Sequence, residues 1–212
     1  MGGVWADGYC SFAVQAPKEL YEFPDWPLPE GTPNFTPGPV FQQYLEDYID
    51  HFGLRSYIRF NARVTGLEPR DGGNPGWIIS IGGGAGNKSE EFDLVVIATG
   101  LYSDVPNKPT FSGEECYQGA ILHSSEIRTQ EPLIGRNVAV VGYGKSAADI
   151  VTQATKVAKN VYMVFRRTHW PVPRKVVGVL PFKWVGLSRM TSAFLPLYQR
   201  STSVERWLHR YR

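Results

Sequence analysis

The clearest chemical pattern in the chain is a glycine-rich run, Gly142-Tyr-Gly144-Lys-Ser146-Ala147, between an apolar stretch and a helical one. In a G-x-G-x-x-A pattern the first glycine permits a tight turn, the second lets a pyrophosphate approach the backbone, and the alanine permits close helix–strand packing. Phosphates bind at the helix N-terminus, where free N–H groups and the helix dipole favour an anion. The run predicts a dinucleotide site at Gly142, Gly144, Ser146 and Ala147. The alternative is a tight strand-to-helix turn without a ligand.

The residues after the next apolar stretch indicate which dinucleotide would bind. A site that prefers NAD normally has an Asp or Glu there, which holds the ribose 2′-hydroxyl. This chain has Arg166-Arg167 instead. Two guanidinium groups can hold a 2′-phosphate through forked hydrogen bonds, so the pattern predicts NADPH. The alternative is a solvated strand end, where charged side chains are common.

Two patterns of apolar residues predict the elements around these positions. A strand over 137–141, a helix over 145–158 and a strand over 160–165 form a strand–turn–helix–strand unit. Further upstream, apolar residues at three- and four-residue spacing predict an amphipathic helix over 39–52, with proline near its first turn and Gly53 just past its end.

The region between these units has the pattern of strands. Residues 57–67 alternate as a strand does, and 77–81 and 92–98 read as a hairpin around a glycine-rich turn at 82–86. The stretch 92–98 is almost wholly apolar, which predicts a strand buried on both faces. Residues 15–39, with seven prolines, and residues 103–136 are expected to be irregular.

Composition excludes several classes of protein. The chain has 212 residues, of which 42% are apolar and 20% charged. Its length corresponds to about one and a half typical domains. Cys10 and Cys116 cannot form a disulfide framework, which favours a reducing compartment such as the cytoplasm. No apolar run reaches the ~18–20 residues of a membrane span, and the histidines and cysteines show no zinc spacing, so no metal site is expected.

The charges are distributed unevenly. Residues 1–149 carry 10 basic and 19 acidic side chains, whereas residues 150–212 carry 12 basic side chains and one acidic. A basic C-terminal third suggests an anionic partner. We assign it to the nucleotide phosphate rather than to nucleic acid. The C-terminal basic and aromatic stretch also leaves peripheral membrane contact open; its residues include Trp184, Arg200, Arg206, Trp207, Arg210 and Arg212.

A series of motifs in order resembles the flavin-containing monooxygenases over most of residues 1–175. The motifs are Gly2-Gly-Val-Trp5, Pro17-Lys18 with Phe23-Pro-Asp-Trp-Pro27, Asp93-Leu-Val-Val-Ile-Ala-Thr99-Gly100, Tyr117-Gln-Gly119-Ala-Ile-Leu-His123 and the run Gly142–Ala147. The resemblance implies an α/β fold of two dinucleotide-binding domains. It divides the chain into a partial FAD domain (1–110), a linker (111–136) and a partial Rossmann-type NADPH domain (137–212).

The resemblance also implies the cofactors FAD and NADPH and further residues that contact them. Trp5, Thr99 and Gly100 would lie near the flavin, and Gly119 and His123 would support NADP binding from the linker. Each has a simpler reading. Trp5 is equally a core residue, Thr99-Gly100 a strand terminus, and His123 a partly buried histidine with local partners.

The implied activity is oxidation of a soft nitrogen or sulfur nucleophile in a small molecule by NADPH and O₂ on FAD. The chain departs from the family pattern in three ways. No G-x-G-x-x-G for FAD precedes Gly2, Gln15 stands where members often have an active-site Asn, and Arg212 comes before the family's return to the FAD domain. Gln15 is therefore the candidate positioning residue.

Two other functions stay open at this point. The chain could be a non-catalytic or incomplete NADPH-binding fragment, or a Baeyer–Villiger-type monooxygenase. The residues after His123, Ser124-Ser-Glu-Ile-Arg128, favour the branch that oxidises nitrogen or sulfur, because Baeyer–Villiger enzymes carry a Trp in this stretch.

Overall fold

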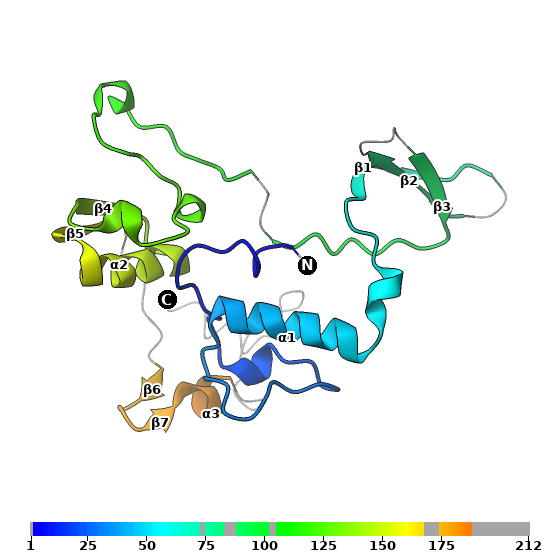
Figure 1. Ribbon diagram of the computed structural model, residues 1–212, viewed down its shortest axis with the longest axis horizontal. Helices are drawn as coiled ribbons and strands as arrows, with labels where there is room; N and C mark the ends of the chain where they lie inside the picture. Colours follow the sequence, from blue (N-terminus) through cyan, green and yellow to red (C-terminus); the bar gives the residue numbers. More distant parts are fainter. Residues whose placement is uncertain (1, 73–74, 83–87, 102–104, 168–173, 188–212) are drawn as a thin grey trace, which may run out of the picture.

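The structure, a computed structural model, describes residues 2–72, 75–82, 88–101, 105–167 and 174–187 (Figure 1). Its elements fall into three groups. One is an antiparallel sheet of β1 (Arg63–Pro69), β2 (Trp77–Gly82) and β3 (Lys88–Phe92). Another is β4 (Asn137–Val141), α2 (Lys145–Val157) and β5 (Asn160–Val164). The third contains α1 (Gly38–His51), β6 (Lys175–Val176), β7 (Leu180–Pro181) and α3 (Phe182–Gly186).

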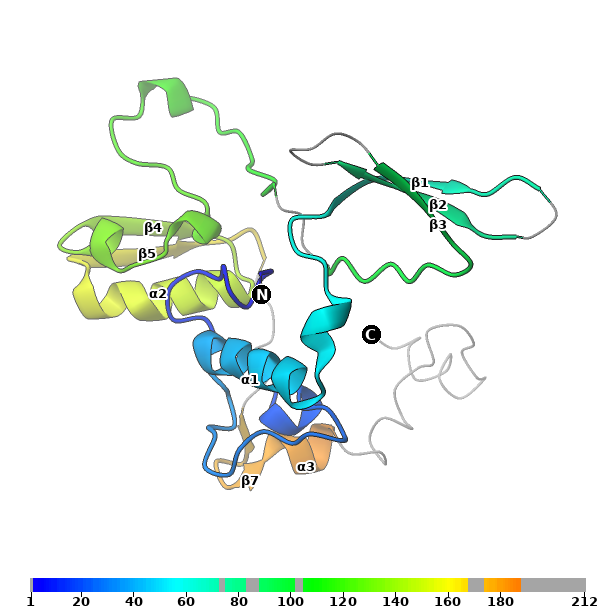
Figure 2. The same cartoon turned by 45° about the vertical axis from the view of Figure 1, so that its right-hand side comes forward.

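The N-terminal residues pack against the group that contains α1. Figures 1 and 2 show the antiparallel sheet and the β4–α2–β5 unit on either side of the N-terminal segment, with α1 beside that segment. Trp5 packs with Phe12, Tyr21 and Phe41, and its ring centroid is 4.5 Å from that of Phe41. The first twenty residues therefore share an aromatic core with α1.

The helix predicted over 39–52 is confirmed as α1. Pro39 lies in its first turn, and Gly53 follows its end with φ +62°, a left-handed conformation that glycine adopts at little cost. Its buried face carries Phe41 and Tyr44, which belong to a core cluster with Val14 and Leu28. The periodic apolar residues thus form the face that the pattern predicts.

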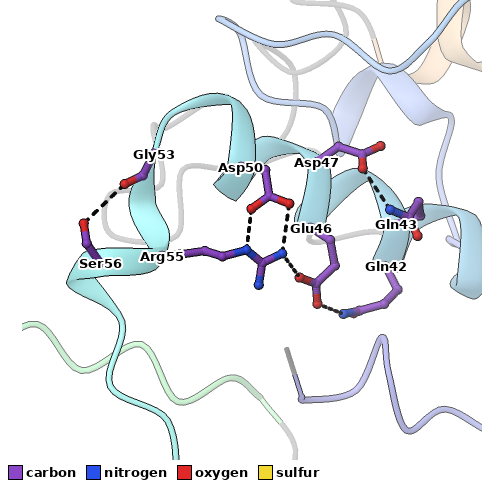
Figure 3. A network of polar contacts seen from close by, with 8 residues as sticks. All are labelled: Gln42, Gln43, Glu46, Asp47, Asp50, Gly53, Arg55 and Ser56. Carbon is purple, nitrogen blue, oxygen red and sulfur yellow. Dashed lines mark hydrogen bonds and ion pairs between the residues drawn. The ribbon is translucent and has the colours of Figure 1, made fainter.

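Polar contacts on the outer side of α1 hold the next turn of chain against it (Figure 3). The guanidinium of Arg55, in the short 3₁₀ helix η2 (Leu54–Tyr57), donates to both carboxylate oxygens of Asp50 and to Glu46 Oε2 at 3.1 Å. The adjacent guanidinium lowers the pKa of Asp50. These contacts fix the direction in which the chain leaves α1.

The antiparallel sheet corrects two predictions. The strand expected over 57–67 begins only at Arg63, because Tyr57 ends η2 and Asn61 has a left-handed φ of 56°. The buried strand expected over 92–98 is wrong, since β3 pairs with β2 over residues 88–92 and then leaves the sheet. Leu94, Val96 and Ile97 lie in the following stretch and are 72–76% exposed. The glycines at 83–86 of the expected turn lie outside the described residues.

The β4–α2–β5 unit is confirmed close to its predicted bounds. The strands are parallel, with Asn137 paired to Asn160 and Val141 to Val164. Ile150 and Ala154 of α2 are buried against one face of the strands. The opposite face is open, for Tyr162 is 58% exposed. The unit is one parallel strand–helix–strand crossover with its helix on one side.

The remaining described residues connect these groups. The stretch from 105 to 136 is irregular, as expected, apart from the 3₁₀ helices η3 (Glu114–Cys116), η4 (Ser124–Glu126) and η5 (Glu131–Leu133). Lys183 of α3 reaches Glu19 Oε1 at 2.5 Å and lowers the pKa of that carboxyl. No helix in the described part of the chain has the length and apolar character needed to cross a bilayer. Arg200, Arg206, Arg210 and Arg212 lie outside the described residues.

Candidate functional site

The turn between β4 and α2, residues 142–144 (the glycine turn), has the geometry that its glycines predict. Gly142 has φ +131°, in a region that favours glycine over every other residue. Its N–H donates to the carbonyl of Val164 at 2.8 Å, which ties the turn to the end of β5. A Cβ at Gly142 would lie 3.6 Å from Cβ of Ala147, so helix and turn approach closely here.

The second glycine faces open space. Apart from Gly144 itself and its two chain neighbours, no heavy atom lies within 4 Å of the position that a Cβ would take there, and no side chain caps the start of α2. The carbonyl of Gly144 accepts from Ala148 at 3.0 Å, the first bond of the helix. A phosphate at this position would meet the N–H groups of the first helical turn and the positive end of the helix dipole. The glycine turn therefore fits the phosphates of a dinucleotide.

Arg166 and Arg167 lie at the same edge of the unit. Parallel pairing of Val141 with Val164 brings the carboxyl ends of β4 and β5 side by side, and both arginines follow β5 and are exposed. Tyr143 and Phe165 pack edge to face with ring centroids 4.6 Å apart. The structure thus places the predicted phosphate turn and the predicted 2′-phosphate ligands at one edge of two strands.

Three residues that the sequence pattern did not identify form a polar cluster at the start of α2. Lys145 forms an ion pair with Asp149 Oδ2, and the Tyr9 hydroxyl donates to the same oxygen at 2.8 Å. The side chains of Lys145 and Asp149 are 29% and 19% exposed. The four-residue spacing of Lys145 and Asp149 predicts their pairing on a helix. No local signal connects Tyr9 with Asp149, which is 140 residues away.

His123 has local partners in the linker. Its N–H donates to Glu126 Oε2 at 2.6 Å, and its Nδ1 accepts from the N–H of Ser125 at 3.3 Å, which together cap η4. The ammonium of Lys108 and the His123 N–H lower the pKa of Glu126. Gly119 is exposed, and a Cβ there would lie 2.4 Å from the Tyr117 ring. Contact of Gly119 or His123 with a dinucleotide stays a prediction.

The residues expected near a flavin are dispersed. Trp5 packs in the aromatic core, Gln15 is exposed with its N–H donating to the Tyr21 hydroxyl at 3.2 Å, and Thr99 and Gly100 lie in the exposed stretch after β3. The described residues therefore fit a dinucleotide phosphate site but do not enclose a flavin. Within the described ranges no three His, Cys, Asp or Glu side chains group as metal ligands would.

The chain matches known proteins over most of its length. The family model described as flavin-binding monooxygenase-like matches residues 4–211. Probable flavin-containing monooxygenase 1 of Arabidopsis thaliana is 33% identical over 233 residues, which cover 92% of this chain and 43% of that protein. Dimethylaniline monooxygenase [N-oxide-forming] 4 of Mus musculus is 31% identical over 87% of this chain and 35% of its own length.

A solved structure is also similar to this chain over part of its length. The S-allyl-L-cysteine S-oxygenase from Allium sativum is similar with a TM-score of 0.66 and 27% identity, over 82% of this chain and 40% of that one. The chain thus spans less than half the length of each of these three proteins. The likeness supports the predicted α/β fold of the two-domain flavoproteins.

Proposed function

The chain belongs to the flavin-binding monooxygenase-like family, and from this membership we propose that it binds NADPH as part of an FAD-dependent monooxygenase. The reaction we propose is oxidation of a soft nitrogen or sulfur in a small molecule, with NADPH and O₂ consumed. One observation carries the proposal. The glycine turn, the start of α2 and Arg166-Arg167 lie at one edge of a parallel strand pair.

The roles of the binding residues follow from this arrangement. The N–H groups of the first turn of α2 would hold the pyrophosphate, with Gly142 and Gly144 leaving room for it. Arg166 and Arg167 would hold the 2′-phosphate, which distinguishes NADPH from NADH. NADPH, when bound, supplies the hydride. The protein's contribution is to fix the dinucleotide at this edge.

Two observations support the nitrogen- or sulfur-oxidising branch. One matching relative is named as an N-oxide-forming monooxygenase and one matching structure as an S-oxygenase. We extend the proposal to a first unit over 1–110, a linker over 111–136 and a dinucleotide unit from 137 onward. Both cysteines are free thiols, which supports a reducing location such as the cytoplasm.

The exposed positions of Thr99 and Gly100 favour a second candidate function. A chain that binds NADPH without assembling a flavin site would act as a dinucleotide-binding module without oxidative activity. The two candidates differ in FAD binding. Uptake of FAD with NADPH consumption supports the monooxygenase, and NADP⁺ binding by a protein that takes up no FAD supports the module.

Calorimetric titration with NADP⁺ and with NAD⁺ tests the binding that both candidates share. We expect NADP⁺ to bind the 212-residue chain more tightly than NAD⁺ does, and the double variant Arg166→Gln/Arg167→Gln to lose at least tenfold in NADP⁺ affinity with little change for NAD⁺. Arg136→Gln is the matched control, because Arg136 is exposed at the opposite end of β4. Equal affinity of the wild type for the two dinucleotides would contradict the proposal.

A further inference from the structure

The N-terminal segment, residues 7–10, is docked on the end of the linker and on α2 through several contacts. The N–H of Cys10 donates to the carbonyl of Ile127 at 2.7 Å. The guanidinium of Arg128 donates to the carbonyls of Asp7 and Gly8. Tyr9 and Cys10 also pack against the buried cluster that contains Ile127 and residues of α2. The segment that leads to Gln15 is therefore held by Ile127 and Arg128 of the linker and by the helix that starts at the glycine turn.

The polar end of this contact reaches the start of α2. The Tyr9 hydroxyl donates to Asp149 Oδ2 at 2.8 Å, and the same oxygen accepts from the ammonium of Lys145. Lys145 is the first residue of α2, directly after Gly144. A continuous chain of polar contacts thus connects the N-terminal segment with the edge where a phosphate would bind.

The charges at the start of α2 explain why this series of polar contacts is needed. A cation in the first turn of a helix is repelled by the positive end of the dipole, so Lys145 alone would extend into solvent. The carboxylate of Asp149, one turn along the helix, compensates this charge and holds the ammonium next to the first-turn N–H groups. The hydroxyl of Tyr9 holds the carboxylate in turn, and Asp149 is mostly buried, which strengthens both interactions.

We propose that Tyr9 is a positioning residue for the dinucleotide site, which acts through Asp149 on Lys145 and couples the N-terminal segment to occupancy of the glycine turn. This inference rests on the proposed function, because it takes a dinucleotide phosphate as the ligand. Lys145 meets a phosphate oxygen with the donors that Asp149 leaves available. Binding at the glycine turn therefore tightens the docking of residues 7–10, and loss of that docking weakens binding.

A double-mutant cycle on the 212-residue chain tests the coupling, with NADP⁺ as the titrant. Tyr9→Phe removes only the hydroxyl and is expected to raise the Kd about fivefold. Asp149→Asn is expected to raise it by at least as much. The double variant should bind no more weakly than Asp149→Asn alone, because Tyr9 acts through that carboxylate. Tyr162→Phe, an exposed tyrosine of β5, is the matched control and should leave the Kd unchanged.

Amide hydrogen exchange distinguishes this coupling from a merely structural role of Tyr9, which would not change the effect of NADP⁺ on exchange. NADP⁺ should slow exchange of the Cys10 N–H in the wild type and have a clearly smaller effect in Tyr9→Phe at equal thermal stability. Wild-type affinity in Tyr9→Phe, or additive losses in the double variant, would overturn the coupling while the dinucleotide site stands. A wild-type chain that does not bind NADP⁺ would overturn the coupling and the proposed function together.

Discussion

The ring of Phe12 lies so close to Gly38 that a Cβ atom at position 38 would stand 2.0 Å from its Cζ atom. Gly8 faces the same ring, and a Cβ there would lie 2.1 Å from Cε1. The N–H of Gly38 also donates to the Phe12 carbonyl at 2.9 Å. One aromatic ring is therefore enclosed by two glycines, and this contact joins residues 8–12 to the first turn of α1.

Replacing Gly38 by alanine tests this contact. In a helix without the ring, alanine would be more stable than glycine by up to ~1 kcal/mol. Here the added methyl group displaces Phe12, and overpacking of this kind costs about 1–3 kcal/mol. We expect a net loss of about 1–2 kcal/mol in the free energy of unfolding, measured by urea denaturation. In a Phe12→Ala background the same change should cost nothing, and an undiminished loss there would contradict the explanation.

The exposed stretch after β3 gives a second prediction. Val96 is 76% exposed, so Val96→Thr should change the free energy of unfolding by less than about 0.5 kcal/mol. Val138 of β4 packs against the buried cluster under α2. Val138→Thr should lower the free energy of unfolding by about 1–3 kcal/mol, because the threonine hydroxyl would lose its hydrogen bonds to water. Urea denaturation of the two variants compares them directly. A large cost for Val96→Thr would mean that residues 94–97 are buried in solution.

The same stretch shows where sequence patterns succeed and where they fail. The α1 helix and the β4–α2–β5 unit were predicted closely, because the spacing of Phe41 and Tyr44 and the glycines at 142 and 144 act over a few residues. A largely apolar run such as 92–98 indicates a buried environment but does not identify the strand that pairs with it. The partner of Tyr9 could not be predicted for the same reason, since the contact with Asp149 is set by the tertiary fold.

Stability should depend on pH through Glu126. The ammonium of Lys108, 2.6 Å away, and the His123 N–H hold the pKa of Glu126 below its ordinary value of 4.5. A depressed folded-state pKa means that the carboxylate stabilises the fold fully above pH 4.5, and that this contribution is lost as the pH falls below 4.5. Glu126→Gln should therefore lower the urea midpoint at about pH 6 and have little effect at about pH 3.

A second variant tests whether Lys108 causes this pH dependence. Lys108→Met removes the larger of the two stabilising groups and leaves the His123 N–H in place. In that background the difference between Glu126 and its Gln variant at about pH 6 should become smaller. A difference of the same size would assign the pH dependence to the His123 contact alone.

The two glycines of the glycine turn should respond differently to the same substitution. Gly142→Ala forces a side chain into φ +131°, which costs about 1–3 kcal/mol of stability, measured by urea denaturation. Gly144 has an ordinary φ of −80° and open space around its Cβ position, so Gly144→Ala should cost less than about 1 kcal/mol. Its methyl group nevertheless occupies the space of the phosphate, and we expect NADP⁺ affinity, measured by calorimetry, to fall at least tenfold. A folded Gly144→Ala variant that binds NADP⁺ as tightly as the wild type would show that no phosphate approaches the backbone there.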